Sequence, residues 1–221
     1  MTTRFIVSIA LAVLTMAPAS HAFRPQLGLR PAEDWIARLE RPERVAGLKT
    51  AEVIEKLHLK PGDVVADIGA GPGVFSWPLA RAVTAGKVYA VEVDKAFIAH
   101  LEMRAKEQQI TNVHPVLGKY DDPLIPTKVD VAFFHDVLHH VDNRGDFLKK
   151  VASYLVPGGR IAIIELDAER PDASHRDDPK LQVTRAQLQD WMAAAGLEKQ
   201  DEIKDLFEDK WFVIYGKPVE K

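Results

Sequence analysis

From about residue 50 onward, the chain alternates between two patterns of apolar and polar residues. Short apolar runs, typical of buried strands, alternate with stretches whose apolar positions recur every three to four residues, as on one face of a helix. The predicted strands are Val64–Ile68, Lys87–Val93, Val113–Leu117, Val129–Phe134, Arg160–Leu166, Leu197–Ile203 and Lys210–Gly216. Such alternation predicts an α/β fold with a mostly parallel sheet and helices on both faces.

Helices are predicted between these strands, and their ends carry recognisable signals. The predicted helices are 74–83, 95–108, 147–155 and 185–195. Thr184 and Gln187 form a capping box for the last helix, which Gly196 ends. The last two strands are joined only by the acidic turn 205–209. Because so short a connection cannot cross over the sheet, we expect these two strands to pair antiparallel.

Residues 23–49 read as an irregular lead with one short helix. Trp35, Ile36 and Leu39 fall at helical spacing, and Pro42 is expected to end that helix. Thr50 is expected to cap a further helix that runs to Leu57. We therefore divide the chain into residues 1–22, the lead and cap helix 23–49, and a main domain 50–221.

The first 22 residues have the three parts of a signal peptide. Arg4 gives a positive start, residues 5–16 are almost wholly apolar, and Ser20-His21-Ala22 ends in small residues. The apolar run is about half the ~20 residues that a membrane-spanning helix needs. We predict cleavage after Ala22, export to the periplasm and no stable membrane span. The alternatives are a buried helix, an interfacial anchor, or translation from Met16, which would leave the protein cytoplasmic.

Composition excludes several classes of function. The chain has 221 residues, a formal net charge of −3 and no cysteine. Without cysteine it has no disulfide, thiolate metal site or cysteine nucleophile. The charge gives no basic field for nucleic acid, so we expect none as a partner. Arg38, Arg41 and Arg44 recur every third residue, which we interpret as a solvated helical face.

The most informative segment is Asp67-Ile68-Gly69-Ala70-Gly71-Pro72-Gly73, between the first strand and the next helix. Glycines at this point let the backbone turn tightly and approach a ligand. A dinucleotide fingerprint needs glycine or alanine at its sixth position, which here is Val74. Pro72 lacks the N–H that a phosphate cradle uses.

The charge of Asp67 points to a cationic ligand. A carboxylate facing a pyrophosphate is repelled by about 4 kcal/mol at 4 Å and intermediate dielectric, whereas an ammonium or sulfonium is attracted. Glu92 ends the second strand, 23 positions beyond Gly69, where an acid can accept hydrogen bonds from both ribose hydroxyls. The loop and Glu92 together predict a nucleoside bearing positive charge.

On these residues the sequence resembles the class I S-adenosylmethionine-dependent methyltransferases, in particular the small-molecule branch related to ubiquinone and menaquinone C-methyltransferases. The resemblance covers roughly residues 57–217 and rests on "PGDVVADIGAGPG", "VYAVEVD", "VDVAFFHDVLHHV", "LVPGGRIAIIE" and "WFVIYGKP". It implies a Rossmann-like, seven-stranded sheet whose last strand is antiparallel. It also implies S-adenosylmethionine as cofactor and a small-molecule or lipid-derived methyl acceptor.

The resemblance also implies roles for individual residues. Asp67, Gly69, Gly71 and Gly73 would hold the methionine portion, Glu92 the ribose, and Asp121 and Asp122 would lie beside the adenine. His135 would sit near the methionine end. Many relatives carry an acid directly after the glycine at position 118, where this chain has Lys119, so the adenine assignment is open by a residue or two.

The catalytic base is left open among the residues that follow the fourth strand: His135, Asp136, His139 and His140. A histidine titrates near neutrality and can take a proton from a hydroxyl or an acidic carbon. The alternative for each is packing or capping. Nothing in the spacing of Asp121 and Asp136 compels a magnesium site, so we predict no metal.

Two other functions compete with the methyltransferase. One is a NAD-linked oxidoreductase, which Asp67 and Val74 oppose. The other is a non-catalytic, nucleoside-binding module of Rossmann-like fold. Neither the acceptor, nor the choice among C-, O- and N-methylation, nor the oligomeric state follows from the sequence.

Overall fold

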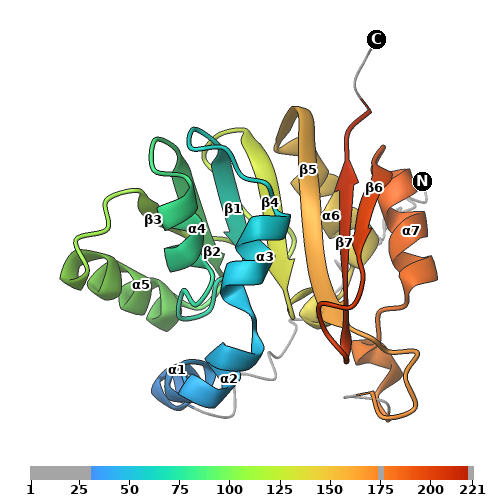
Figure 1. Ribbon diagram of the computed structural model, residues 1–221, viewed down its shortest axis with the longest axis horizontal. Helices are drawn as coiled ribbons and strands as arrows, with labels where there is room; N and C mark the ends of the chain where they lie inside the picture. Colours follow the sequence, from blue (N-terminus) through green and yellow to red (C-terminus); the bar gives the residue numbers. More distant parts are fainter. Residues whose placement is uncertain (1–30, 174–176, 219–221) are drawn as a thin grey trace, which may run out of the picture.

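Seven strands form one sheet in the computed structural model, which describes residues 31–173 and 177–218 (Figure 1). They are β1 (Val64–Ile68), β2 (Lys87–Glu92), β3 (Val113–Leu117), β4 (Val129–His135), β5 (Leu155–Leu166), β6 (Glu198–Ile203) and β7 (Lys210–Gly216). Their order is β3-β2-β1-β4-β5-β7-β6. The signal peptide predicted for residues 1–22 lies outside the described residues.

The pairing confirms the predicted fold class. Strands β3, β2, β1, β4 and β5 pair parallel to one another, and β7 runs antiparallel to both β5 and β6. All seven predicted strands are present. The largest difference is in β5, which begins at Leu155 rather than Arg160 and shifts register against β4 near Val129.

Helices cover both faces of the sheet. They are α1 (Ala32–Leu39), α2 (Pro42–Gly47), α3 (Thr50–Lys56), α4 (Ser76–Ala82), α5 (Lys95–Glu107), α6 (Arg144–Ser153) and α7 (Arg185–Ala194), with short 3₁₀ turns η2 (Leu138–His140) and η3 (Pro179–Leu181). Within residues 31–173 and 177–218, no helix is long and apolar enough to cross a membrane.

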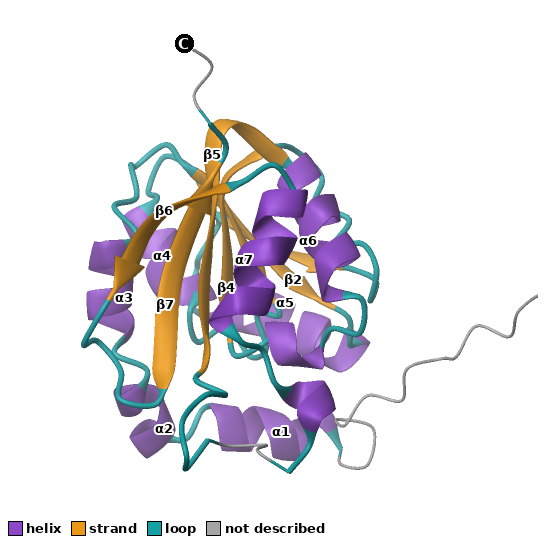
Figure 2. Ribbon diagram, turned by 90° about the vertical axis from the view of Figure 1, so that its right-hand side faces the viewer, coloured by secondary structure: helices purple, strands orange, loops and turns teal. Residues whose placement is uncertain are grey.

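Side chains of successive strand residues alternate between two buried cores. We call the side covered by α3, α4 and α5 the α4 face, and the side covered by α6 and α7 the α6 face (Figures 1 and 2). Phe133 packs on the α4 face and Phe134 on the α6 face, and both are fully buried. Burying such a side chain contributes roughly 1.5–3 kcal/mol, so both faces stabilise the sheet.

Helices α1 and α2 lie beyond the carboxyl ends of the parallel strands, at the lower edge in Figures 1 and 2. Leu39 of α1 lies 3.6 Å from where a Cβ on Gly71 would stand. Glu40 is 3.2 Å from the Nε2 of His100 on α5. The lead segment therefore covers the edge at which the predicted cofactor loop ends.

Two expectations for the lead segment were wrong. Pro42 does not end its helical part but begins α2, because the first turn of a helix does not need the N–H that proline lacks. Thr50 does not cap α3; it is the first helical residue. Lys49, in the left-handed conformation with φ of 47°, is the cap. Helix α6 also begins earlier than predicted, at Arg144.

Candidate functional site

The loop between β1 and α4 has the backbone conformation that its glycines predict. Gly69, Gly71 and Gly73 have φ values of 70°, 54° and 91°, a region that residues with a Cβ rarely adopt. A Cβ at Gly69 would overlap Val137, and one at Gly73 would stand 2.6 Å from the Trp77 ring. Gly69 and Gly73 are therefore also required because Val137 and the Trp77 ring pack closely against their backbone. The sequence did not predict this second reason for glycine.

Asp67 is buried beneath this loop rather than open at its mouth. The side chain is 3% exposed, and the Ser76 hydroxyl donates a 2.6 Å hydrogen bond to its carboxylate. Burial raises the pKa of Asp67 to about 7; the Ser76 hydrogen bond opposes this shift and nearby Glu92 adds to it. The predicted attraction for a cation therefore comes from a carboxylate that is only partly ionised at neutral pH.

Glu92 reaches from the end of β2 to the same loop. Its Oε1 accepts a 2.8 Å hydrogen bond from the amide of Gly71, and its Oε2 accepts one of 2.9 Å from Val93. Burial raises its pKa, and the two amides oppose that shift. Each carboxylate oxygen has a second lone pair, so Glu92 can brace the loop and still accept hydrogen bonds from ribose hydroxyls.

The two acids predicted beside the adenine differ in their surroundings. Asp122 accepts hydrogen bonds from the Tyr154 hydroxyl at 2.8 Å and the Leu124 amide at 3.0 Å, and lies 3.4 Å from Lys150. Asp121 is exposed. Asp122 is therefore tied to the end of α6, and the adenine role of Asp121 or Asp122 stays a prediction.

His135 ends β4 on the α4 face. Its ring lies 4.7 Å from that of Phe75, and its Nδ1 is 3.5 Å from the Asp136 carboxylate. Burial lowers the pKa of His135 to about 4; Asp136 opposes the shift, and Lys210 and Arg44 add to it. At neutral pH this imidazole is uncharged and a weak base, so the structure argues against His135 as the proton acceptor.

Asp136, the next residue, joins β4 to the start of β7. Its carboxylate is held by Lys210 at 2.8 and 2.7 Å, and its φ is 53°. Burial works to raise its pKa, but His135 and Lys210 outweigh burial, and the pKa stays below its usual range. Asp136 is therefore an ionised partner of Lys210 and not a proton acceptor.

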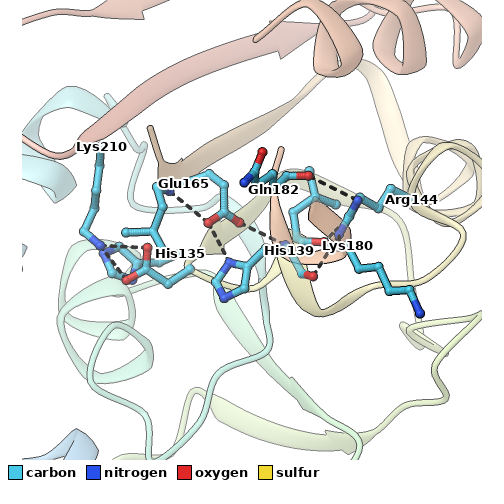
Figure 3. A network of polar contacts seen from close by, with 10 residues as sticks. His135, His139, Arg144, Glu165, Lys180, Gln182 and Lys210 are labelled. Carbon is cyan, nitrogen blue, oxygen red and sulfur yellow. Dashed lines mark hydrogen bonds and ion pairs between the residues drawn. The ribbon is translucent and has the colours of Figure 1, made fainter. Parts of the chain in front are cut away.

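His139 lies in η2 on the α6 face and is paired with a carboxylate (Figure 3). Its Nδ1 is 2.7 Å from Oε1 of Glu165, and its amide donates a 3.1 Å hydrogen bond to Oε2. The Leu166 amide donates to Glu165 as well, at 2.9 Å. The histidine is 5% exposed and the carboxylate 1%. In the neutral tautomer that carries its proton on Nδ1, the ring donates to Glu165 and has a lone pair on Nε2.

Sequence reasoning missed Glu165 and the support around His139. The signal for Glu165 was its position as the last acid of the apolar run "IAIIE", at the edge where the other candidates lie. The third candidate histidine, His140, lies against His139, with ring centroids 4.0 Å apart and the rings tilted by 49°. The guanidinium of Arg144 donates to the carbonyls of Leu138 and His139 at 3.0 and 2.9 Å, which fixes the η2 turn.

The arrangement fits a nucleoside that carries positive charge. Both carboxylates are buried, which raises the pKa of each, and the charge of Glu92 raises that of Asp67 further. A cation near them would favour their ionised forms. A diphosphate would disfavour those forms. No group of three or more histidine and acidic side chains that could hold a metal ion occurs within residues 31–173 and 177–218.

Comparison with known proteins identifies the fold family. Residues 59–210 match the family described as a methyltransferase domain. The fold is similar to a solved S-adenosylmethionine-dependent methyltransferase from Aquifex aeolicus, with a TM-score of 0.74 at 21% identity, over 86% of this chain and all of that one.

Two curated relatives match this chain over only part of their own length. A mitochondrial ubiquinone biosynthesis O-methyltransferase of Schizosaccharomyces pombe is 28% identical over 51% of this chain and 41% of its own length. A 27-O-demethylrifamycin SV methyltransferase of Amycolatopsis mediterranei is 28% identical over 58% of this chain and 48% of its own length. The match to these relatives therefore spans less than half of their length.

Proposed function

The chain belongs to the methyltransferase domain family, and from this premise we propose that the whole protein transfers a methyl group from S-adenosylmethionine to a small-molecule or lipid-derived acceptor. The proposal rests on the Glu92 carboxylate, which accepts a hydrogen bond from the Gly71 amide, and on Asp67, which is buried beneath the same loop. This places two acids at the carboxyl ends of β1 and β2, where open α/β sheets bind ligands.

In this proposal, two acids at this edge bind different parts of the cofactor. Glu92 accepts from the ribose hydroxyls, and Asp67 attracts the positive charge of the methionine portion. When bound, S-adenosylmethionine supplies an electrophilic methyl group on a cationic sulfur. Transfer to a nucleophile is an in-line displacement, so alignment of acceptor and methyl supplies much of the rate.

We assign the proton acceptor to His139. The Oε1 atom of Glu165 lies 2.7 Å from the Nδ1 atom of His139. In this role the Glu165 carboxylate stabilises the imidazolium that forms when Nε2 takes a proton from the acceptor. The lowered pKa of His135 and the contacts of Asp136 with Lys210 disfavour these two residues as the proton acceptor. A hydroxyl or an acidic carbon on the acceptor is the proton source that fits such a base.

The acceptor class is supported by composition and by relatives. The net charge of −3 offers no general attraction for nucleic acid. The two curated relatives described above bear the names of ubiquinone and rifamycin methyltransferases. We extend from them only the class of acceptor, a small or lipid-derived molecule.

Export is part of the proposal and is supported by the signal-peptide pattern of residues 1–22. Mass spectrometry of the protein isolated from its source cell tests this directly. We expect a mature chain beginning at Phe23 in the periplasmic fraction. A chain beginning at Met16 and found in the cytoplasm would contradict it.

Calorimetry with the purified protein tests the cofactor. We expect S-adenosylmethionine and S-adenosylhomocysteine to bind, and Glu92→Ala to weaken binding at least about tenfold because hydrogen bonds to a charged group are lost. Lys95→Ala, just beyond the same strand, is the matched control and should bind normally. Tight binding of NAD in place of these ligands would overturn the assignment.

A further inference from the structure

Two basic side chains from distant parts of the chain, Arg44 and Lys210, lie within electrostatic range of His135 at the end of β4. Arg44 on α2 lies within electrostatic range of Arg38 and Arg41, and of Asp136. Asp136 is already engaged, since Lys210 holds its carboxylate at 2.8 and 2.7 Å. The attraction between Arg44 and Asp136 is therefore shared with another cation, and the group carries excess positive charge.

The position of Arg44 makes that excess charge costly. Burial lowers the pKa of Arg44, and repulsion from Arg38 and Arg41 adds to the lowering. Its guanidinium donates a 3.1 Å hydrogen bond to the carbonyl of Leu39, which holds it toward the joint between α1 and α2. A half-buried cation among like charges gains stability from any anionic oxygen that reaches it.

A second, independent observation marks the same place. The Nε2 atom of His135 is buried and has no hydrogen-bond partner among the described residues. Its ring is nearly enclosed, between Phe75 and Asp136, and within electrostatic range of Arg44 and Lys210. Buried polar atoms without partners are rare in folded proteins, and a hydrogen-bonding ligand is one explanation for such an atom.

The backbone adds a third sign of a built site. Asp136 has a φ of 53°, a conformation that costs free energy for a residue with a side chain. It is held there by its amide, which donates to the Ile164 carbonyl at 3.0 Å, and by the two contacts to Lys210. Asp136 therefore fixes the positions of Lys210 and His135 relative to each other.

We propose that Arg44, Lys210, Asp136 and His135 form a subsite for an anionic oxygen group, a carboxylate or a phosphate ester, carried by the methyl acceptor. An oxygen anion pairs with Arg44 and Lys210, and an O–H or N–H of the same molecule donates to the Nε2 of His135. The inference rests on the proposed function and adds to it that the acceptor is anionic. The arginine repeat of the lead segment thereby gains a role beyond solvation.

Calorimetry with defined probes tests the subsite. Octanoate and octyl phosphate supply the two anionic groups on a short apolar chain, and octan-1-ol is their neutral match. Each is titrated into the full chain with and without S-adenosylhomocysteine. We expect an anionic probe to bind, Arg44→Ala to weaken it about tenfold or more, and Arg44→Lys to retain most of the affinity. Arg81→Ala, on an exposed turn of α4, is the control.

Three results would overturn the proposal. The first is that neither anionic probe binds better than octan-1-ol. The second is that Arg44→Ala binds them as well as the unaltered chain does. The third is that Arg44→Ala weakens S-adenosylhomocysteine but not 5′-methylthioadenosine, which lacks the carboxylate, while leaving the probes unaffected. That result assigns the anion to the cofactor. Failure of the unaltered chain to bind S-adenosylhomocysteine contradicts the proposed function instead.

Discussion

Two histidines four residues apart end up on opposite faces of the same sheet edge, with opposite electrostatic surroundings. On the α6 face, His139 contacts the Glu165 carboxylate at 2.7 Å. On the α4 face, His135 is buried near Lys210 and Arg44, and its pKa falls to about 4. Figure 3 shows the two groups next to each other. The two histidines therefore differ in their neighbours: His135 has two cations nearby besides Asp136, whereas His139 has a carboxylate at hydrogen-bond distance.

The same contrast extends to the acids. Asp67 on the α4 face has a carboxylate that accepts a hydrogen bond from the Ser76 hydroxyl, and burial raises its pKa to about 7. Glu165 on the α6 face accepts hydrogen bonds from two amides and His139. The α4 face therefore shifts Asp67 and His135 toward their uncharged forms, and the α6 face pairs its acid with a base.

The substitution with the largest expected effect removes the histidine of the His139–Glu165 pair on the α6 face. His139→Asn keeps a side-chain N–H for Glu165 but removes the Nε2 lone pair. We expect methyl transfer to fall at least about a hundredfold, since a general base contributes that much or more. The measurement is transfer of a tritiated methyl group into an extract of the source cell. Affinity for S-adenosylhomocysteine should stay the same, and His114→Asn on β3 is the control.

Glu165→Gln distinguishes a catalytic pair from a structural one. If Glu165 acts through His139, the double variant His139→Asn/Glu165→Gln should transfer methyl no more slowly than His139→Asn alone, because the two residues act as a unit. If the double variant instead loses activity by the product of the two single losses, the pair only holds η2 in place. The same conclusion follows if His139→Asn stays active.

The next effect concerns His135 and stability. Its folded pKa, about 4, lies below its ordinary value of 6.5, so the unfolded chain binds the proton more readily. This group therefore costs no stability above pH 6.5, and stability falls as pH falls from 6.5 toward 4. We expect it to account for about 2 kcal/mol of the loss between pH 7 and pH 5.

Urea unfolding at the two pH values checks this prediction. The variant His135→Phe, which has no titrating group at that position, should lose correspondingly less stability over the same interval. An NMR titration in which the His135 ring gains its proton near pH 6.5 would show that the α4 face does not suppress the charge, and would remove the contrast with His139.

The smallest effect concerns Asp67 and the cofactor. Its folded pKa is raised to about 7, so its burial costs stability as pH rises from about 4 to about 7. A cationic ligand favours the ionised carboxylate, so binding of S-adenosylmethionine should tighten about tenfold between pH 6 and pH 8. Calorimetry measures this, and Asp67→Asn should show no such change. Equal pH dependence in both proteins would place the charge response elsewhere.

The architecture was predictable because it depends on local patterns. Each buried strand is an apolar run of its own, and Thr184 with Gln187 forms the capping box that their types and spacing predict. The glycine loop was predictable for the same reason, since positive φ at Gly69, Gly71 and Gly73 restricts the residue type. The start of α2 was not, because proline both ends and begins helices.

The different surroundings of His135 and His139 were not predictable, because they depend on partners remote in sequence. Glu165 lies 26 residues after His139, and Lys210 lies 74 residues after Asp136. The orientation of Asp67 was equally hidden. Its position before the loop is local, but its burial against Ser76 depends on how α4 docks on the sheet.

Arg144 links the turn that bears His139 to the segment around η3. Besides the carbonyls of Leu138 and His139, its guanidinium donates to those of Lys180 and Gln182 in and beside η3 (Figure 3). The turn bearing His139 and the crossing from β5 to α7 are therefore clamped together by one side chain. A change at this one guanidinium would therefore disturb both segments at once.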